Sequence, residues 1–216
     1  MAVVTVDTPY TIADLIERLG NIPLSRVLMD PSPGNATEAD LLEAERRYDR
    51  LYELVDGTLV EKAVGFHESL LAAVLIGILR QFVVPRNLGV VTGPDGMVRL
   101  FPGLVRGPDV AYASWDRFPG RKLPKEAIPN LAPDLAIEVL SKSNTRAEMK
   151  RKRGEYFAAG VPMVWEVDRK RRTVSVYTPD GAVTVLKDSQ RLEGGDILPG
   201  FVLELSDLFA ELDRHG

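Results

Sequence analysis

Two acidic residues lie within segments that otherwise have the composition of buried strands. Glu138 interrupts the apolar run Leu135–Leu140, and Asp109 opens the segment Pro108–Tyr112. An ionised carboxylate buried in an apolar strand is costly unless a cation, a hydrogen-bond donor or solvent meets it. If the two strands are neighbours, the two carboxylates, with a backbone carbonyl and waters, would form an ordinary site for Mg²⁺ or Mn²⁺.

A third candidate is basic. Lys152 lies in the helix expected after the Glu138 strand, so its ammonium group could reach back over the strand end. There it could orient or deprotonate a water molecule, or stabilise negative charge on a phosphate. Each residue also has a structural interpretation: Glu138 as a strand-end glutamate, Asp109 as a turn residue after proline, and Lys152 as a solvated helix residue.

Two further residues complete the set of candidates. Glu53 lies in the strand-like segment Tyr52–Val55, and His67 lies near the start of an apolar helix. A glutamate on an alternating strand usually faces solvent. A single histidine beside an aromatic residue is more often structural than a ligand, so His67 is the weaker of the two candidates.

The composition limits the available chemistry. The chain has 216 residues, no cysteine and two histidines, so disulfides, thiolate zinc sites and multi-histidine metal sites are excluded. Any metal would be held mainly by oxygen atoms. The net charge of −4 does not by itself indicate nucleic-acid binding. Two local basic runs, Arg146–Arg153 and Arg169–Arg172, are either solvated surfaces or phosphate-binding patches.

Nothing in the hydropathy pattern indicates a membrane protein. The N-terminus lacks the basic start and apolar core of a signal peptide. The most apolar stretch, Leu70–Leu79, is about half of the roughly 20 residues that a spanning helix needs, and it is interpreted as a buried core or interface helix. We therefore expect a cytoplasmic protein that does not contact membranes.

The first fifty residues are predicted to be a helical lead-in that packs on the core. One helix is expected at Thr11–Leu19, which ends at Gly20, and a second at Thr37–Arg50. Thr37 followed by Asp40 resembles a capping box.

From residue 51 the pattern becomes mixed. A hairpin is predicted around Asp56-Gly57. Helices are expected at Phe66–Val83, Thr145–Ala159 and Ser206–Leu212. The expected strands are Leu51–Val55, Thr58–Lys62, Gly89–Thr92, Met97–Leu100, Asp109–Ala113, Asp134–Leu140, Met163–Val167, Thr173–Tyr177 and Ala182–Leu186. The order predicts an α/β (mixed α+β) fold with a central mixed sheet flanked by helices, in one domain that comprises residues 51–216 and the lead-in 1–50.

Several segments, in order, resemble the largely uncharacterised Uma-type family of bacterial proteins, which are assigned as restriction endonucleases of the PD-(D/E)XK superfamily. The resemblance covers roughly Leu51 to Phe209. The segments that carry it are Tyr52–Val60, His67, Gly107–Val110, Pro133–Ser141, Lys152 with Tyr156, Ala159–Pro162, Trp165 with Val167-Asp168, and Leu198–Phe201.

The resemblance implies a restriction-endonuclease-like fold and a set of roles. Asp109 and Glu138 would be the metal ligands, with the carbonyl of Val139 as a third. Glu53 would match an early acidic residue that completes the surroundings of the cation, and His67 matches a frequent family position of unclear role. The superfamily places lysine two residues after the glutamate, where this chain has Leu140, so Lys152 would have to supply the lysine.

Two functional hypotheses follow. The first is a Mg²⁺- or Mn²⁺-dependent endonuclease that hydrolyses phosphodiester bonds in DNA, with RNA as another substrate that the sequence does not distinguish. The second is a catalytically silent nuclease fold that serves as a DNA-binding or oligomeric interaction module. By analogy with nucleases that cut both strands of a duplex, we expect a homodimer.

Overall fold

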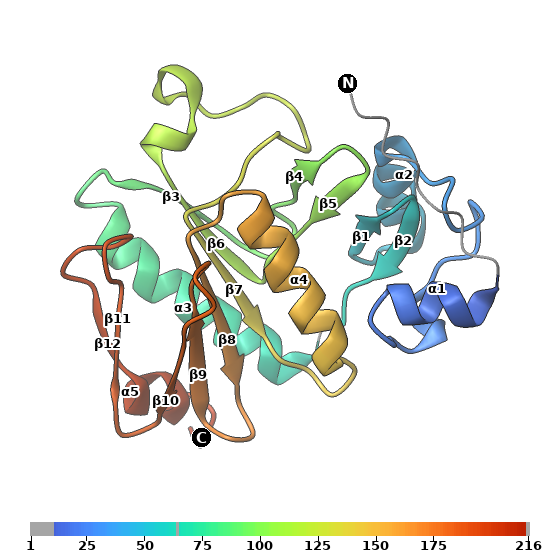
Figure 1. The fold of residues 1–216 in the computed structure, drawn as a ribbon. Helices are drawn as coiled ribbons and strands as arrows, with labels where there is room; N and C mark the ends of the chain where they lie inside the picture. The colour runs from blue at the N-terminus through green and yellow to red at the C-terminus, as the bar shows by residue number, and fades with distance from the viewer. Residues whose placement is uncertain (1–10, 64, 215–216) are drawn as a thin grey trace.

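The computed structural model describes residues 11–63 and 65–214. Residues 1–10, on which the signal-peptide argument depends, lie outside these ranges. In Figure 1 a mixed sheet lies between α3 (Phe66–Val83) and α4 (Arg146–Ala158), with a smaller sheet, α1 (Ile12–Arg18) and α2 (Glu38–Tyr48) on one side. The lead-in contains α1, the 3-10 helix η1 (Leu24–Arg26) and α2.

The predicted helices of the lead-in are confirmed. The side chain of Thr11 accepts a hydrogen bond from the backbone of Asp14 at the start of α1. Thr37 and Asp40 form the predicted capping box at the start of α2. Such caps satisfy amide groups that the first helical turn leaves without a partner.

The predicted hairpin forms one edge of a four-stranded sheet with the order β2-β1-β5-β4. Its strands are β1 (Tyr52–Val55), β2 (Thr58–Glu61), β4 (Val98–Phe101) and β5 (Leu104–Arg106). Asp56 and Gly57 both have positive φ, 48° and 68°, which matches the right-handed twist of the two flanking strands. The three-residue strand β5 was not expected from the sequence.

The larger sheet is the predicted mixed sheet, with the order β10-β9-β8-β7-β6-β3. Its strands are β3 (Gly89–Thr92), β6 (Val110–Ser114), β7 (Leu135–Val139), β8 (Met163–Asp168), β9 (Thr173–Tyr177) and β10 (Val183–Lys187). Only β7 and β8 run parallel, and α4 (Arg146–Ala158) connects them. The predicted central mixed sheet is thus present, and the remaining described strands form the four-stranded sheet and a two-stranded sheet that the sequence did not predict.

Helices cover both faces of the six-stranded sheet (Figure 1). The apolar helix α3 (Phe66–Val83) packs on one face, and its buried side chains share a core cluster with Val110, Ile137 and Trp165. The short pair β11 (Arg191–Glu193) and β12 (Val202–Glu204) and helix α5 (Leu205–Ala210) border this cluster. Within the described ranges, α3 is the one helix that is long and apolar enough to span a membrane, and its place in this core explains its composition.

The lead-in packs against the opposite face. Leu19 and Ile22 belong to one buried cluster with Ala136 of β7 and Tyr156 of α4. The guanidinium of Arg26 donates to the carboxylate of Glu148 at 2.8 Å, which fixes η1 to the start of α4. These contacts join Leu19, Ile22 and Arg26 to β7 and α4. That residues 1–50 fold together with the remainder of the chain stays a prediction.

We expect Ile22→Ala to destabilise the whole molecule, since this side chain is 2% exposed. Truncation of a buried isoleucine usually costs about 2–5 kcal/mol. Denaturant unfolding followed by tryptophan fluorescence tests this, because both tryptophans lie beyond residue 50. Leu42→Ala is the matched control, because Leu42 is 42% exposed. A fluorescence midpoint that Ile22→Ala leaves unchanged would mean that the lead-in unfolds separately.

Candidate active site

Asp109 and Glu138 lie at the same end of two neighbouring strands. Asp109 immediately precedes β6, Glu138 lies in β7, and the adjacent residues Val110 and Ile137 are direct cross-strand partners. The carboxylate of Asp109 accepts a hydrogen bond from the backbone N–H of Val139 at 2.8 Å. The sheet register therefore brings together the two carboxylates that the sequence singled out.

Lys152 is buried beside Glu138 and does not project into solvent. Its Nζ lies 3.1 Å from both carboxylate oxygens of Glu138 and 3.1 Å from Oε1 of Glu53. One turn further along α4, the hydroxyl of Tyr156 donates to Glu138 at 2.6 Å. Residues four apart lie on the same helix face, so α4 presents an ammonium and a hydroxyl group to one carboxylate.

Glu53 reaches the site from the four-stranded sheet. Its carboxylate accepts hydrogen bonds from Nη1 of Arg106 at 2.7 Å and from the backbone N–H of Gly107 at 3.2 Å. Arg106 also donates through Nε to Glu155 of α4 at 2.8 Å. Glu53 and Arg106 thus connect the four-stranded sheet to α4, with side chains that are almost fully buried.

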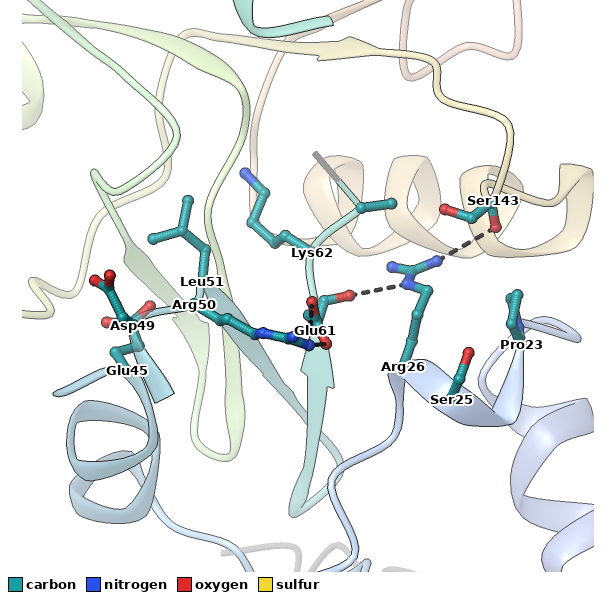
Figure 2. Close-up of a pocket in the computed structure, with 11 residues that line it drawn as sticks. Pro23, Ser25, Arg26, Glu45, Asp49, Arg50, Leu51, Glu61, Lys62 and Ser143 are labelled. Carbon is teal, nitrogen blue, oxygen red and sulfur yellow. Dashed lines mark hydrogen bonds and ion pairs between the residues drawn. The ribbon is translucent and has the colours of Figure 1, made fainter. Parts of the chain in front are cut away.

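Lys62, just after β2, is a site residue that the sequence did not reveal. Its Nζ lies 3.1 Å from Oδ1 of Asp109 and also donates to the carbonyl oxygen of Gly107. A hollow of about 810 Å³ adjoins Lys62. Figure 2 shows this hollow, with the side chain of Lys62 extending away from Arg26 and Glu61. Asp109 is the most exposed residue of the site, with 17% of its side chain exposed compared with 4% for Lys62, so solvent reaches the acidic pair from the Asp109 side.

The charges of the site interact strongly. Burial raises the pKa of Glu138, Lys152 opposes this effect, and the negative charges of Asp109 and Glu53 add to it, so that the pKa is raised to about 6. Burial also acts to raise the pKa of Glu53, but Lys152 and Arg106 outweigh it and hold that pKa well below its usual range. For Lys152, burial lowers the pKa, while Glu138 and Glu53 more than compensate and raise it. Lys152 therefore stays protonated at neutral pH.

The donor set of the acidic pair fits a hard divalent cation. Asp109 and Glu138 provide only oxygen atoms, and each carboxylate oxygen can accept more than one partner. The raised pKa of Glu138 indicates that the neighbouring groups stabilise its ionised carboxylate less well than water would. Among the described residues, no three acidic or histidine side chains converge on one point, so carbonyl groups or waters would have to complete the coordination.

The remaining sequence candidates are placed as follows. Val139 lies beside Asp109 through its backbone N–H, and the role of its carbonyl oxygen stays a prediction. His67 is exposed in the first turn of α3, where its ring meets the edge of Phe66 at a centroid distance of 5.8 Å. Its proposed part in the site also stays a prediction. Lys62 ends a predicted strand and Arg106 lies in the unpredicted β5, so no local pattern showed that either side chain points inward.

This mixed α/β fold is similar to that of a solved protein described as a "putative nuclease belonging to DUF820" from Anabaena variabilis. The TM-score is 0.68 and the identity is 20%, over 76% of this chain and 92% of the other. The family model described as "Putative restriction endonuclease" (Uma2) matches residues 38–206. The chain belongs to this family, as the resemblance of its motifs implied. No curated protein matches the chain.

We expect the stability difference between Glu138→Gln and the wild type to depend on pH. A carboxyl group whose pKa is higher in the folded than in the unfolded state stabilises the fold while protonated, and this contribution is lost as pH rises through the folded pKa. With pKa values of about 6 folded and 4.5 unfolded, the wild type should lose about 2 kcal/mol relative to the variant between about pH 4.5 and 6.5. Urea unfolding of both proteins across this range measures the difference. A difference that stays constant with pH would contradict the raised pKa.

Proposed function

We propose that this protein is a metal-dependent endonuclease that hydrolyses phosphodiester bonds in DNA. The observation that carries the proposal is the acidic pair, Asp109 and Glu138, at one end of adjacent strands, with a buried lysine against each carboxylate. Family membership supports the same reaction class. The fold alone would not, since one fold can support many functions.

Asp109 and Glu138, with the carbonyl of Val139, would hold Mg²⁺ or Mn²⁺. When bound, the cation would neutralise the scissile phosphate and lower the pKa of a coordinated water. The chain's own groups position this donor set: the backbone N–H of Val139 orients Asp109, while Lys152 and Tyr156 orient Glu138.

Lys152 is assigned an electrostatic role. Because Glu138 and Glu53 raise its pKa, its ammonium group does not give up a proton at neutral pH and does not serve as a general base. It instead holds Glu138 and stabilises negative charge that develops on the phosphate. Lys62, beside the more exposed Asp109, is the second positive group within reach of a phosphate at the acidic pair.

The proposal extends to the cellular setting of the protein. We infer a cytoplasmic enzyme that acts as a homodimer, because the two strands of a duplex are most simply cut by two sites. DNA is the proposed substrate, and an RNA backbone offers the same phosphate chemistry.

One observation favours a second candidate, a catalytically silent module that binds nucleic acid or another copy of itself. Three carboxylates, the buried Glu53 and Glu138 and the partly buried Asp109, face three buried cations, Lys62, Lys152 and Arg106. The charges therefore balance without a metal. A silent module would bind DNA equally well in chelator and after substitution of the acidic pair, and it would not cut.

Isosteric variants separate these functions. We expect Asp109→Asn and Glu138→Gln each to lower Mn²⁺-dependent cleavage of plasmid DNA by about 100-fold or more, since each removes a charge that binds the cation. Gel analysis of nicked and linear products measures the rate, and addition of EDTA should abolish it. Asp116→Asn with Glu126→Gln is the control, because both side chains are exposed and both residues lie in the connection from β6 to β7, beyond the end of β6 that is opposite to Asp109. Full activity of both site variants would contradict the assignment.

A further inference from the structure

Most cations of the two basic runs are already engaged in ion pairs. In α4, the buried Lys152 pairs with Glu138. Arg151 pairs with Glu155 at 2.7 Å, and Arg153 pairs with Glu166. In the second run, Arg169 pairs with Glu68 at 2.7 Å and Arg172 with Asp188 at 2.5 Å. The runs are therefore not two uniform basic surfaces, and only some of their members are available to a ligand.

Three exposed cations line one groove of about 650 Å³, whereas Lys150, another exposed cation of the first run, does not line it. Lys142 and Arg146 come from the end of the β7–α4 loop and the first turn of α4, and Lys170 comes from the turn between β8 and β9. All three are exposed, and no hydrogen bond or ion pair of their side chains occurs within residues 11–63 and 65–214. Arg171, at 3.8 Å from Asp168, adds a weakly held fourth charge.

The acidic residues of the groove do not cancel this charge. Glu166 is engaged by Arg153, and Oδ1 of Asp168 accepts the backbone N–H groups of Lys170 and Arg171. The remaining polar lining includes hydroxyl groups of the kind that bond to phosphate oxygens, on Thr173, Ser175 and Tyr177. Ser141, Asn144 and Thr145 also line the groove, but their side chains already donate to Asn144, to Glu148 and to the carbonyl oxygen of Gly20, respectively. The first turn of α4 is closed by the capping box of Thr145 and Glu148, so the positive charge comes from side chains.

The groove lies at the same end of β7 as the acidic pair. It begins at Leu140, two residues after Glu138. The loop between β7 and α4 separates it from the hollow in Figure 2: Ser143 lines that hollow, whereas Lys142 and Asn144 line the groove. The hollow in turn borders Lys62, whose ammonium group contacts Asp109. Both depressions therefore border the loop that directly follows the Glu138 strand.

We propose that this groove binds the phosphodiester backbone of the nucleic acid on one side of the cut. The inference rests on the proposed function for its substrate, DNA. It adds the surface and the residues that hold the strand: Lys142, Arg146 and Lys170 contact successive phosphates, and the hydroxyl groups bond to their oxygens. Because the whole molecule carries a net charge of −4, attraction to DNA must come from such a local concentration of free cations.

The test is DNA binding without cleavage. Fluorescence anisotropy in EDTA measures the affinity of a labelled duplex for the wild type and for Lys142→Gln/Arg146→Gln/Lys170→Gln. We expect the triple variant to bind at least about tenfold more weakly at low salt. The slope of log K against log salt concentration should become shallower by about 0.9 for each phosphate that the variant no longer neutralises.

The matched control is Arg121→Gln/Lys122→Gln/Lys125→Gln, which removes the same charge. These exposed residues follow β6 and precede β7, so they lie at the opposite end of the sheet from the groove (Figure 1). The control should keep the affinity and the salt slope of the wild type. Equal weakening by both triple variants, or by neither, would overturn the groove assignment. Unchanged melting temperatures establish that all variants are folded.

The results of this binding assay test the groove separately from the proposed nuclease activity. If the groove variant does not bind DNA while wild-type protein cuts nothing with Mn²⁺, the groove stands and the nuclease proposal falls. If cleavage is intact and the groove variant binds normally, only the groove falls. A duplex RNA of the same sequence identifies the source of the phosphates: tighter binding of RNA than of DNA would overturn DNA as the occupant.

Discussion

The structure depends on a buried lysine shared between carboxylates from two sheets. Lys152 of α4 joins Glu138 of the six-stranded sheet to Glu53 of the four-stranded sheet, at 3.1 Å from each. Arg106 repeats the arrangement by joining Glu53 to Glu155. Removing one partner from such a buried pair commonly costs about 3–5 kcal/mol, because the remaining charge is left uncompensated. The packing of the two sheets against α4 is therefore coupled to the chemistry of the site.

The same network determines the electrostatic state of the acidic pair. Glu53 has two cations within hydrogen-bonding distance and stays ionised, while Glu138 has one cation, which it shares. Asp109 is oriented by a backbone N–H group and is more exposed. The two proposed ligands thus differ: Glu138 is fixed and poorly compensated, whereas Asp109 is open to solvent. A pair of carboxylates in this state favours the binding of an additional positive charge, and this is the physical basis of the proposed metal site.

Much of the fold could be predicted because its signals are local. The Asp56-Gly57 turn, the capping box of α2 and the apolar composition of α3 each indicate an element within a few residues. The strands β5, β11 and β12 have three residues each, too few for a visible alternation, and they exist because neighbouring strands pair with them. For the same reason the division into separate sheets could not be predicted: it depends on which strands meet in space.

The site was predictable only in part. Asp109 and Glu138 were found because a carboxylate in an apolar strand is conspicuous, and the register then placed them together. By pattern alone Lys152 resembled its basic neighbours, and only the family resemblance distinguished it. No sequence pattern identified Lys62 or Arg106 as site residues, because the sequence does not show whether a basic side chain in or after a strand points toward solvent or toward a carboxylate of the site.

The most direct test of the central claim is calorimetric titration of Mn²⁺ into the wild type and into Asp109→Ala/Glu138→Ala, each alone and with a non-cleavable DNA duplex. The account predicts that the wild type binds Mn²⁺ and that the double variant does not, at a pH above the pKa of about 6 for Glu138. Equal binding by both proteins would place the metal elsewhere. Absence of binding by the wild type, even with DNA present, would contradict a metal site at the acidic pair.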